Sequence, residues 1–171
     1  AINFMLRWAR GLVCMPCDGA RLDELEIGPM LPAGTEGCDT AFTVSIDHRA
    51  AGSGIGAADR ALTVRKILDA DSRAEHFVRP GHVFPLRARP GGVLERRGHT
   101  EAAVDLARLA GLPPVAVICE VLHDDGSPAR FQYLEMFAQE HRVAMVSVAQ
   151  IVEHRERAAV GASTRTRTLS L

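Results

Sequence analysis

Strand-like and helix-like segments alternate along most of this sequence, and that alternation restricts the possible folds more than any other feature. Val115–Leu122 is an apolar run interrupted only by Glu120, as in a strand buried on both faces, and Thr40–Ile46 is rich in β-branched residues. Ala58–Leu68 and Thr100–Ala110 carry apolar residues at helical spacing. The pattern predicts an α/β (α+β) single domain, with a mixed sheet flanked by helices.

A chain of 171 residues is long enough for one compact domain with its own core. We expect residues 1–157 to form this domain and residues 158–171, at the Ser/Thr/Arg-rich end of the chain, to be a disordered tail. The other expected elements are helices over Asn3–Arg10, Asp18–Leu25, Phe131–His141 and Ala149–Arg157, and strands over Leu12–Met15 and Val143–Val148.

The charges are nearly balanced, with 20 Lys+Arg against 21 Asp+Glu. This balance does not favour nucleic acid or an anionic membrane as a partner, and no apolar run approaches the ~20 residues of a membrane helix. With no signal peptide visible, a cytoplasmic protein is expected. Cys14 and Cys17 form a C-x-x-C pair without the second pair of a zinc ribbon, so they are either half-buried thiols or a redox pair.

The densest polar cluster lies where a loop enters a predicted helix, and it contains Arg96, Arg97, Gly98, His99 and Thr100. Backbone N–H groups at a helix start favour an anion, so Arg96, Thr100 and these amides would form a phosphate cradle. His99 is a candidate metal ligand or acid/base. The alternative is a plain capping box with Thr100 as the cap, and the two interpretations are compatible.

Two further residues are candidates for chemistry. Glu120 stands near the end of an apolar strand, where burial of a carboxylate is costly unless it is paired or functional, although an exposed strand end would also explain it. His82 follows a Pro-Gly pair and is either functional or a surface-turn residue. The run Gly52–Gly56 is weak evidence for a phosphate loop, and Asp59-Arg60 after it is typical of a helix-start salt bridge.

Several long motifs, in one order, resemble the 3,4-dihydroxy-2-butanone 4-phosphate synthase family of riboflavin biosynthesis. The resemblance covers roughly residues 1–155. The motifs are Thr40–Asp47 (TAFTVSID), Ala57–Arg60 (AADR), Arg79–Arg87 (RPGHVFPLR), Gly91–Leu94 (GGVL), Arg97–Ala107 (RGHTEAAVDLA) and Val117–Glu120 (VICE).

The resemblance implies a lyase that converts D-ribulose 5-phosphate into 3,4-dihydroxy-2-butanone 4-phosphate and formate, using Mg²⁺ (or Mn²⁺), as a homodimer. His99 would then be a metal ligand. His82 and Glu120 would be the catalytic acid/base residues, with Glu120 also touching the substrate. Arg96 and Thr100 would hold the substrate phosphate, within a substrate-binding stretch that includes Arg97, Gly98 and His99.

The sequence departs from the family pattern at its start, because nothing in it matches the family's N-terminal acidic, metal-binding loop. Mg²⁺ prefers oxygen ligands, so His99 with waters alone would be a poor site. The upstream strand is also missing, and we expect an unpaired sheet edge and an uncovered apolar face. The alternative to an active synthase is therefore a fragment or a catalytically impaired paralogue, which would dimerise, regulate a partner or bind a sugar phosphate. A third possibility is that another chain of a dimer supplies the missing acids.

Overall fold

The structure of the chain is a computed structural model that describes residues 1–32 and 39–168, with side chains described as far as residue 158. The bounds of the described helices and strands are given next. The helices are α1 (Ile2–Phe4), a π-helical turn (Met5–Ala9), α2 (Gly19–Glu24), α3 (Ala57–Leu68), two 3₁₀ turns (Ala74–His76 and Gly92–Leu94), α4 (His99–Leu109), α5 (Phe131–His141) and α6 (Val148–Thr168), and the strands are β1 (Arg10–Cys17), β2 (Ile46–His48), β3 (Phe77–Arg87) and β4 (Ile118–Val121).

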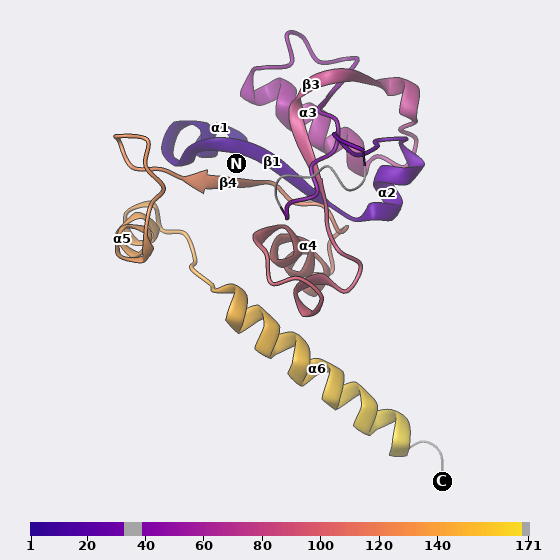
Figure 1. Cartoon of the computed structure of the whole chain (residues 1–171), viewed down its shortest axis with the longest axis vertical. Coiled ribbons are helices and arrows are strands. Elements are labelled where there is room, and N and C mark those ends of the chain that lie inside the picture. The colour runs from indigo at the N-terminus through magenta and orange to yellow at the C-terminus, as the bar shows by residue number, and fades with distance from the viewer. Residues whose placement is uncertain (33–38, 169–171) are drawn as a thin grey trace.

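The four strands form one mixed sheet in the order β2-β3-β1-β4. β1 runs parallel to β3, with Cys14 opposite Phe84, whereas β2 and β4 pair antiparallel with their neighbours. In Figure 1, α3 lies on one side of this strongly twisted sheet and α4 on the other. The predicted α/β (α+β) class and mixed sheet flanked by helices are confirmed.

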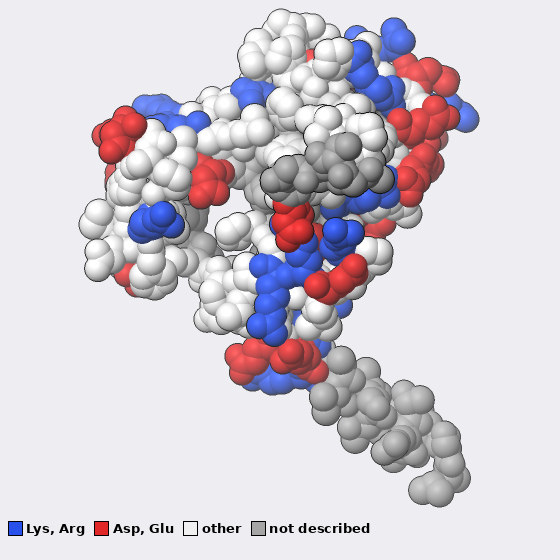
Figure 2. Space-filling model, viewed as in Figure 1, with Lys and Arg blue, Asp and Glu red and all other residues white. Residues whose placement is uncertain are grey.

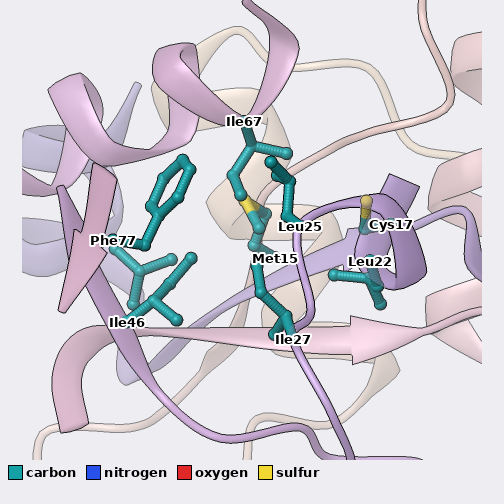
Figure 3. Close-up of a cluster of buried hydrophobic side chains, with 9 residues drawn as sticks. Met15, Cys17, Leu22, Leu25, Ile27, Ile46, Ile67 and Phe77 are labelled. Atoms are coloured by element: carbon teal, nitrogen blue, oxygen red, sulfur yellow. The ribbon is translucent and has the colours of Figure 1, made fainter. Parts of the chain in front are cut away.

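The main core lies between the sheet and α2 and α3, and Figure 3 shows its side chains in contact. Side chains alternate between the two faces of a strand, so Met15 and Cys17 of β1 both point into this core. They meet Ile67 of α3 and Phe77 of β3, and all four side chains are at most 2% exposed. The intervening residue positions of β1 therefore face α4, on the other side of the sheet.

The helices predicted from local signals are present. Asp18 caps α2, with its carboxylate accepting a 2.9 Å hydrogen bond from the backbone N–H of Ala20. The predicted helices around α3, α4 and α5 agree with the structure to within one residue at each end. Thr100 is not a cap, because Gly98 holds the N-cap position of α4 and Thr100 lies buried inside the first turn.

Two strand predictions are wrong in part. Thr40–Ile46 forms only single bridges before β2 begins at Ile46, at Phe42 with Leu86 and at Thr43 with Pro29. Its neighbour Pro85 accepts a hydrogen bond from the Thr43 N–H but has no N–H to return one, so the ladder is interrupted. Val115–Leu122 contributes a shorter strand, β4, which is antiparallel and partly exposed at the sheet edge rather than parallel and buried.

The C-terminal part differs from the predictions. Residues 143–147 are exposed and form no strand, because no strand of the described chain lies beside them to pair with their backbone. α6 begins at Val148 and continues to Thr168, over most of the segment expected to be a disordered tail; the side chains beyond residue 158 and the whole of residues 169–171 lie outside the described part. The domain boundary at residue 157 stays a prediction.

We predict that His48 makes the fold less stable in mild acid. Burial, the nearby positive charge of Lys66 and a second histidine, His76, lower the pKa of His48. The His48 Nδ1 atom also accepts a 3.2 Å hydrogen bond from the N–H of Ala50. The unfolded chain therefore takes up a proton first, and the free energy of unfolding should fall as the pH drops below about 6.5. Urea unfolding at pH 7.5 and 5.5 measures this, and an undiminished pH slope in His48→Ala would contradict it.

Candidate active site

The loop before α4 is held by a buried carboxylate. Glu101 is 1% exposed and accepts a 3.1 Å hydrogen bond from the backbone N–H of Arg89. Its other oxygen accepts a 2.7 Å hydrogen bond from Nη1 of Arg96. This bond raises the pKa of the Arg96 guanidinium, which stays charged and fixed at the N-terminus of α4.

Arg96 also reaches back towards the chain before β2. Its Nε atom lies 3.4 Å from Oδ2 of Asp39, and its Nη2 atom lies 3.5 Å from Oγ1 of Thr40. Arg97 and His99 are exposed beside it. The structure thus brings Arg96 and the first turn of α4 together, as the sequence predicted for an anion cradle, with the Arg96 side chain still 22% exposed.

His82 is paired with an aspartate that the sequence reasoning did not single out. The His82 Nδ1 atom lies 2.6 Å from Oδ2 of Asp47, and the His82 backbone N–H donates to Oδ1 of the same carboxylate at 3.0 Å. The Asp47 side chain is 10% exposed and that of His82 is 42% exposed. Asp47 therefore holds one ring nitrogen, which leaves Nε2 of His82 to carry or accept a proton.

A glycine loop closes over this pair. Gly54 has a φ of +82°, and a Cβ atom added there would lie 2.0 Å from Oδ2 of Asp47 and 2.6 Å from Nδ1 of His82. Asp59 accepts hydrogen bonds from the N–H groups of Gly52 and Gly54, at 3.1 and 3.0 Å. These amides are used within the loop, so the structure assigns them to shaping the loop rather than to a phosphate.

Glu120 and His99 line the same groove. The groove has a volume of about 530 Å³ and lies between α4, β4 and the segment that leads into α6, with a mainly apolar lining that includes Leu106 and Ile118. Glu120 is exposed on the edge strand, not buried as the apolar run suggested, because β4 has the sheet on one side only.

Strand register places the remaining candidates on the same side of the sheet. Cys14 is opposite Phe84 in β3 and Ile118 in β4, so these residues share the face that α4 covers. His82 precedes Phe84 by two residues and Glu120 follows Ile118 by two, which puts both side chains on that face as well. His82 and Glu120 thus lie, on separate strands, on the face of the sheet that α4 covers, and Glu120 shares its groove with His99 at the start of α4.

Comparisons with known proteins identify the family. Residues 1–154 match the sequence profile of 3,4-dihydroxy-2-butanone 4-phosphate synthase. The chain belongs to this family. It is 54% identical over 154 residues to the synthase of Agrobacterium fabrum, covering 90% of this chain and 72% of that protein. It is 51% identical over 160 residues to the riboflavin biosynthesis protein RibBA of Aquifex aeolicus, covering 92% of this chain and 39% of the relative.

Solved structures of the synthase family have the same fold. The Candida albicans synthase superposes with a TM-score of 0.82 at 42% identity, covering 90% of this chain and 76% of that one. A synthase in complex with two magnesium ions gives a TM-score of 0.85 at 38% identity, covering 91% and 78%. The chain spans about two fifths of the length of the RibBA relatives that it matches. No described helix is both long and apolar enough to cross a membrane.

The described residues offer an incomplete site for the metal that the synthase family implies. His99 and Glu120 share a groove, yet no group of three or more His, Cys, Asp or Glu side chains suited to a metal ion occurs in the described part of the chain. Mg²⁺ is octahedral and prefers oxygen ligands. These two side chains therefore fit part of a coordination sphere and do not by themselves fit a whole one.

The thiols of Cys14 and Cys17 are expected to be inert in the folded chain. Burial raises the pKa of Cys14 to about 11 and that of Cys17 to about 12. At pH 8 this lowers the thiolate fraction, and with it the alkylation rate, by at least about a hundredfold relative to an unfolded thiol. Iodoacetamide labelling followed by peptide mass spectrometry, with and without urea, measures both rates. Rapid labelling of either cysteine in the folded protein would favour the redox interpretation of the pair.

Proposed function

We propose that this chain catalyses the conversion of D-ribulose 5-phosphate into 3,4-dihydroxy-2-butanone 4-phosphate and formate. The proposal is supported by the placement of His82 and Glu120 on the face of the sheet that α4 covers, in a chain that matches the family over residues 1–154. The two products together contain every atom of the substrate, so the reaction consumes no oxidant, reductant or other co-reactant. The site must bind a phosphate, move protons and allow the carbon skeleton of the substrate to rearrange.

The phosphate binds at the start of α4 in this proposal. Arg96 supplies a fixed positive charge, and the buried Thr100 hydroxyl and the first backbone N–H groups of α4 supply donors at the positive end of the helix dipole. The exposed guanidinium of Arg97 adds a second charge, while Gly98 and His99 line the approach. This end of the substrate is thereby held while its other carbons face the groove.

Proton transfer is assigned to His82 and Glu120. A proton on a carbon next to a carbonyl is weakly acidic, and removing it needs a base held within hydrogen-bond reach. His82 accepts that proton at Nε2, because Asp47 holds Nδ1 and stabilises the imidazolium that results. Glu120, exposed at the edge of the groove, takes or returns the proton of a substrate hydroxyl. Two separate groups allow the proton removed at one carbon to be returned at another.

A divalent ion, Mg²⁺ or Mn²⁺, supplies Lewis-acid polarisation of the substrate oxygens when it is bound. We assign one coordination position to His99, and the other ligands come from water, from the substrate or from acids outside the described residues. The metal-bearing synthase structure supports a divalent ion in this family. We also propose a homodimer, which sedimentation equilibrium would measure.

Formate release from ribulose 5-phosphate tests the function. The assay uses the chain with Mg²⁺, with Mn²⁺ and with EDTA, and His99→Ala is the control for contaminating host enzyme. Metal-dependent release that disappears in His99→Ala is expected. A folded chain that releases no formate under any of these conditions would contradict the proposal for this chain alone, and adding the family's upstream acidic segment would then show whether those acids are what is lacking.

A further inference from the structure

Two buried acids of α4 hold the loop that carries Arg96. Glu101 and Asp105 are one helical turn apart and are 1% and 0% exposed. Glu101 accepts a hydrogen bond from the backbone N–H of Arg89, and Asp105 accepts one from that of Val93 at 2.9 Å. Two points of the loop, at Arg89 and Val93, are therefore fixed to one face of one helix.

The turn on Asp105 leads directly to Arg96. Gly92 has a φ of +62°, and a Cβ atom added there would lie 2.4 Å from both carboxylate oxygens of Asp105, so only glycine permits this approach. The Arg96 backbone N–H donates to the carbonyl oxygen of Gly92 at 3.0 Å. Any shift of the turn relative to Asp105 is thus passed to the backbone of Arg96.

The charge of Asp105 is balanced mainly from α6. Nη1 of Arg155 lies 2.5 Å from Oδ1 of Asp105. The two groups form an ion pair whose geometry is not that of a hydrogen bond. Nη1 of Arg108 lies 3.5 Å from the same oxygen, and Arg108 also pairs with Asp18. A buried carboxylate that loses its cation is left uncompensated, which is strongly unfavourable. Figure 2 shows acidic and basic side chains gathered where α6 begins below α4.

Apolar contacts place α6 against the same turn. Ile151 and Val152 of α6 are 4% and 5% exposed and form one cluster with Val93 and Ala102. Val93 is also the residue whose N–H bonds to Asp105. The turn is therefore held from two sides, by the carboxylate of α4 and by the apolar face of α6.

We propose that Asp105 and Arg155 are positioning residues for the phosphate site, through which α6 sets the place of Arg96. Neither side chain needs to touch the substrate. Arg155 keeps the Asp105 carboxylate in place, Asp105 keeps the turn at Gly92 and Val93 in place, and the turn fixes the backbone that carries Arg96. This inference rests on the proposed phosphate site at the α4 N-terminus.

The test measures the binding of inorganic phosphate by calorimetry, together with KM and kcat for ribulose 5-phosphate. Arg155→Met is expected to weaken phosphate binding and raise KM by about tenfold with a smaller change in kcat, because a small misplacement of a binding group is costly. Arg157→Met is the matched control, since among the described residues Arg157 pairs with exposed Glu153 on the outside of α6 and its side chain is 71% exposed. Its phosphate affinity should match that of the wild type. Equal affinities for Arg155→Met and wild type would overturn the inference.

Further variants separate positioning from folding. Arg155→Lys keeps the positive charge and should bind phosphate within about twofold of wild type. In the double variant Arg155→Met/Asp105→Asn the neutral amide needs no cation, so part of the affinity lost in Arg155→Met should return. If none returns although the double variant is folded by circular dichroism, the effect of Arg155 does not pass through Asp105 and the inference fails.

Arg96→Ala separates this inference from the proposed function. If Arg96→Ala does not weaken phosphate binding, the phosphate site itself is misplaced and the proposed function loses its main support. If Arg96→Ala weakens binding and Arg155→Met does not, only the positioning role is wrong.

Discussion

His82→Gln is expected to lower kcat for formate release by about 10²–10⁴-fold, the usual contribution of a positioned acid/base group. The variant keeps a polar side chain of similar reach but cannot exchange a proton at neutral pH. KM should change little, because the phosphate is held at the opposite side of the site by Arg96 and the α4 N-terminus. Steady-state kinetics with saturating Mg²⁺ measures both constants.

Asp47→Asn distinguishes a histidine that moves protons from one that only fills space. An amide facing Nδ1 no longer stabilises an imidazolium, so kcat should fall, while thermal stability changes less. The control is His154→Gln on the exposed side of α6. A His82→Gln enzyme with kcat within a fewfold of wild type would remove His82 from the mechanism.

Elements with strong local signals were predictable from the sequence. α3 and α4 have an apolar face at helical spacing and a clear end, and Asp18 offers the short acceptor that a helix N-terminus needs. In these cases the residues that decide the structure lie within about one turn of each other along the chain. The position of Arg96 beside the first turn of α4 was predictable for the same reason.

Strands depend on partners that local patterns do not reveal. Residues 143–148 have the composition of a strand, but no described strand pairs with them, and Val148 begins α6. Val115–Leu122 is apolar enough for a buried strand, yet β4 occupies a sheet edge, which leaves Glu120 exposed. Whether a strand is central or at an edge is decided by the whole sheet.

The sequence did not reveal Asp47 and Glu101, the acids that hold His82 and Arg96, because their partners are distant along the chain or their positions look ordinary. Asp47 and His82 are 35 positions apart and meet only because β2 and β3 pair. Glu101 looked like an ordinary first-turn acid of a helix, and its burial against Arg96 requires the loop to fold back. One signal was present in the sequence. Glu101 and Asp105 lie one turn apart on the amphipathic helix predicted over Thr100–Ala110, and both carboxylates need partners if they are buried.

Arg96→Ala is expected to weaken phosphate binding by roughly 1.5–3 kcal/mol, as for the loss of a charge-assisted hydrogen bond. At fixed kcat this raises KM for ribulose 5-phosphate by one to two orders of magnitude. Titration with inorganic phosphate and steady-state kinetics measure the two effects separately. Arg65→Ala, an exposed arginine on α3, is the matched control for the loss of one positive charge.

Arg96→Ala also leaves Glu101 buried without its cation. Thermal stability and phosphate affinity therefore change together, and a second variant is needed to separate the two effects. Arg96→Ala/Glu101→Gln removes the uncompensated charge while its amide oxygen still accepts from the Arg89 N–H. The double variant should therefore regain thermal stability relative to Arg96→Ala and yet bind phosphate no better. Recovery of affinity along with stability would mean that Arg96 acts by holding the loop, and that the phosphate is bound by Thr100, Arg97 and the helix N-terminus instead.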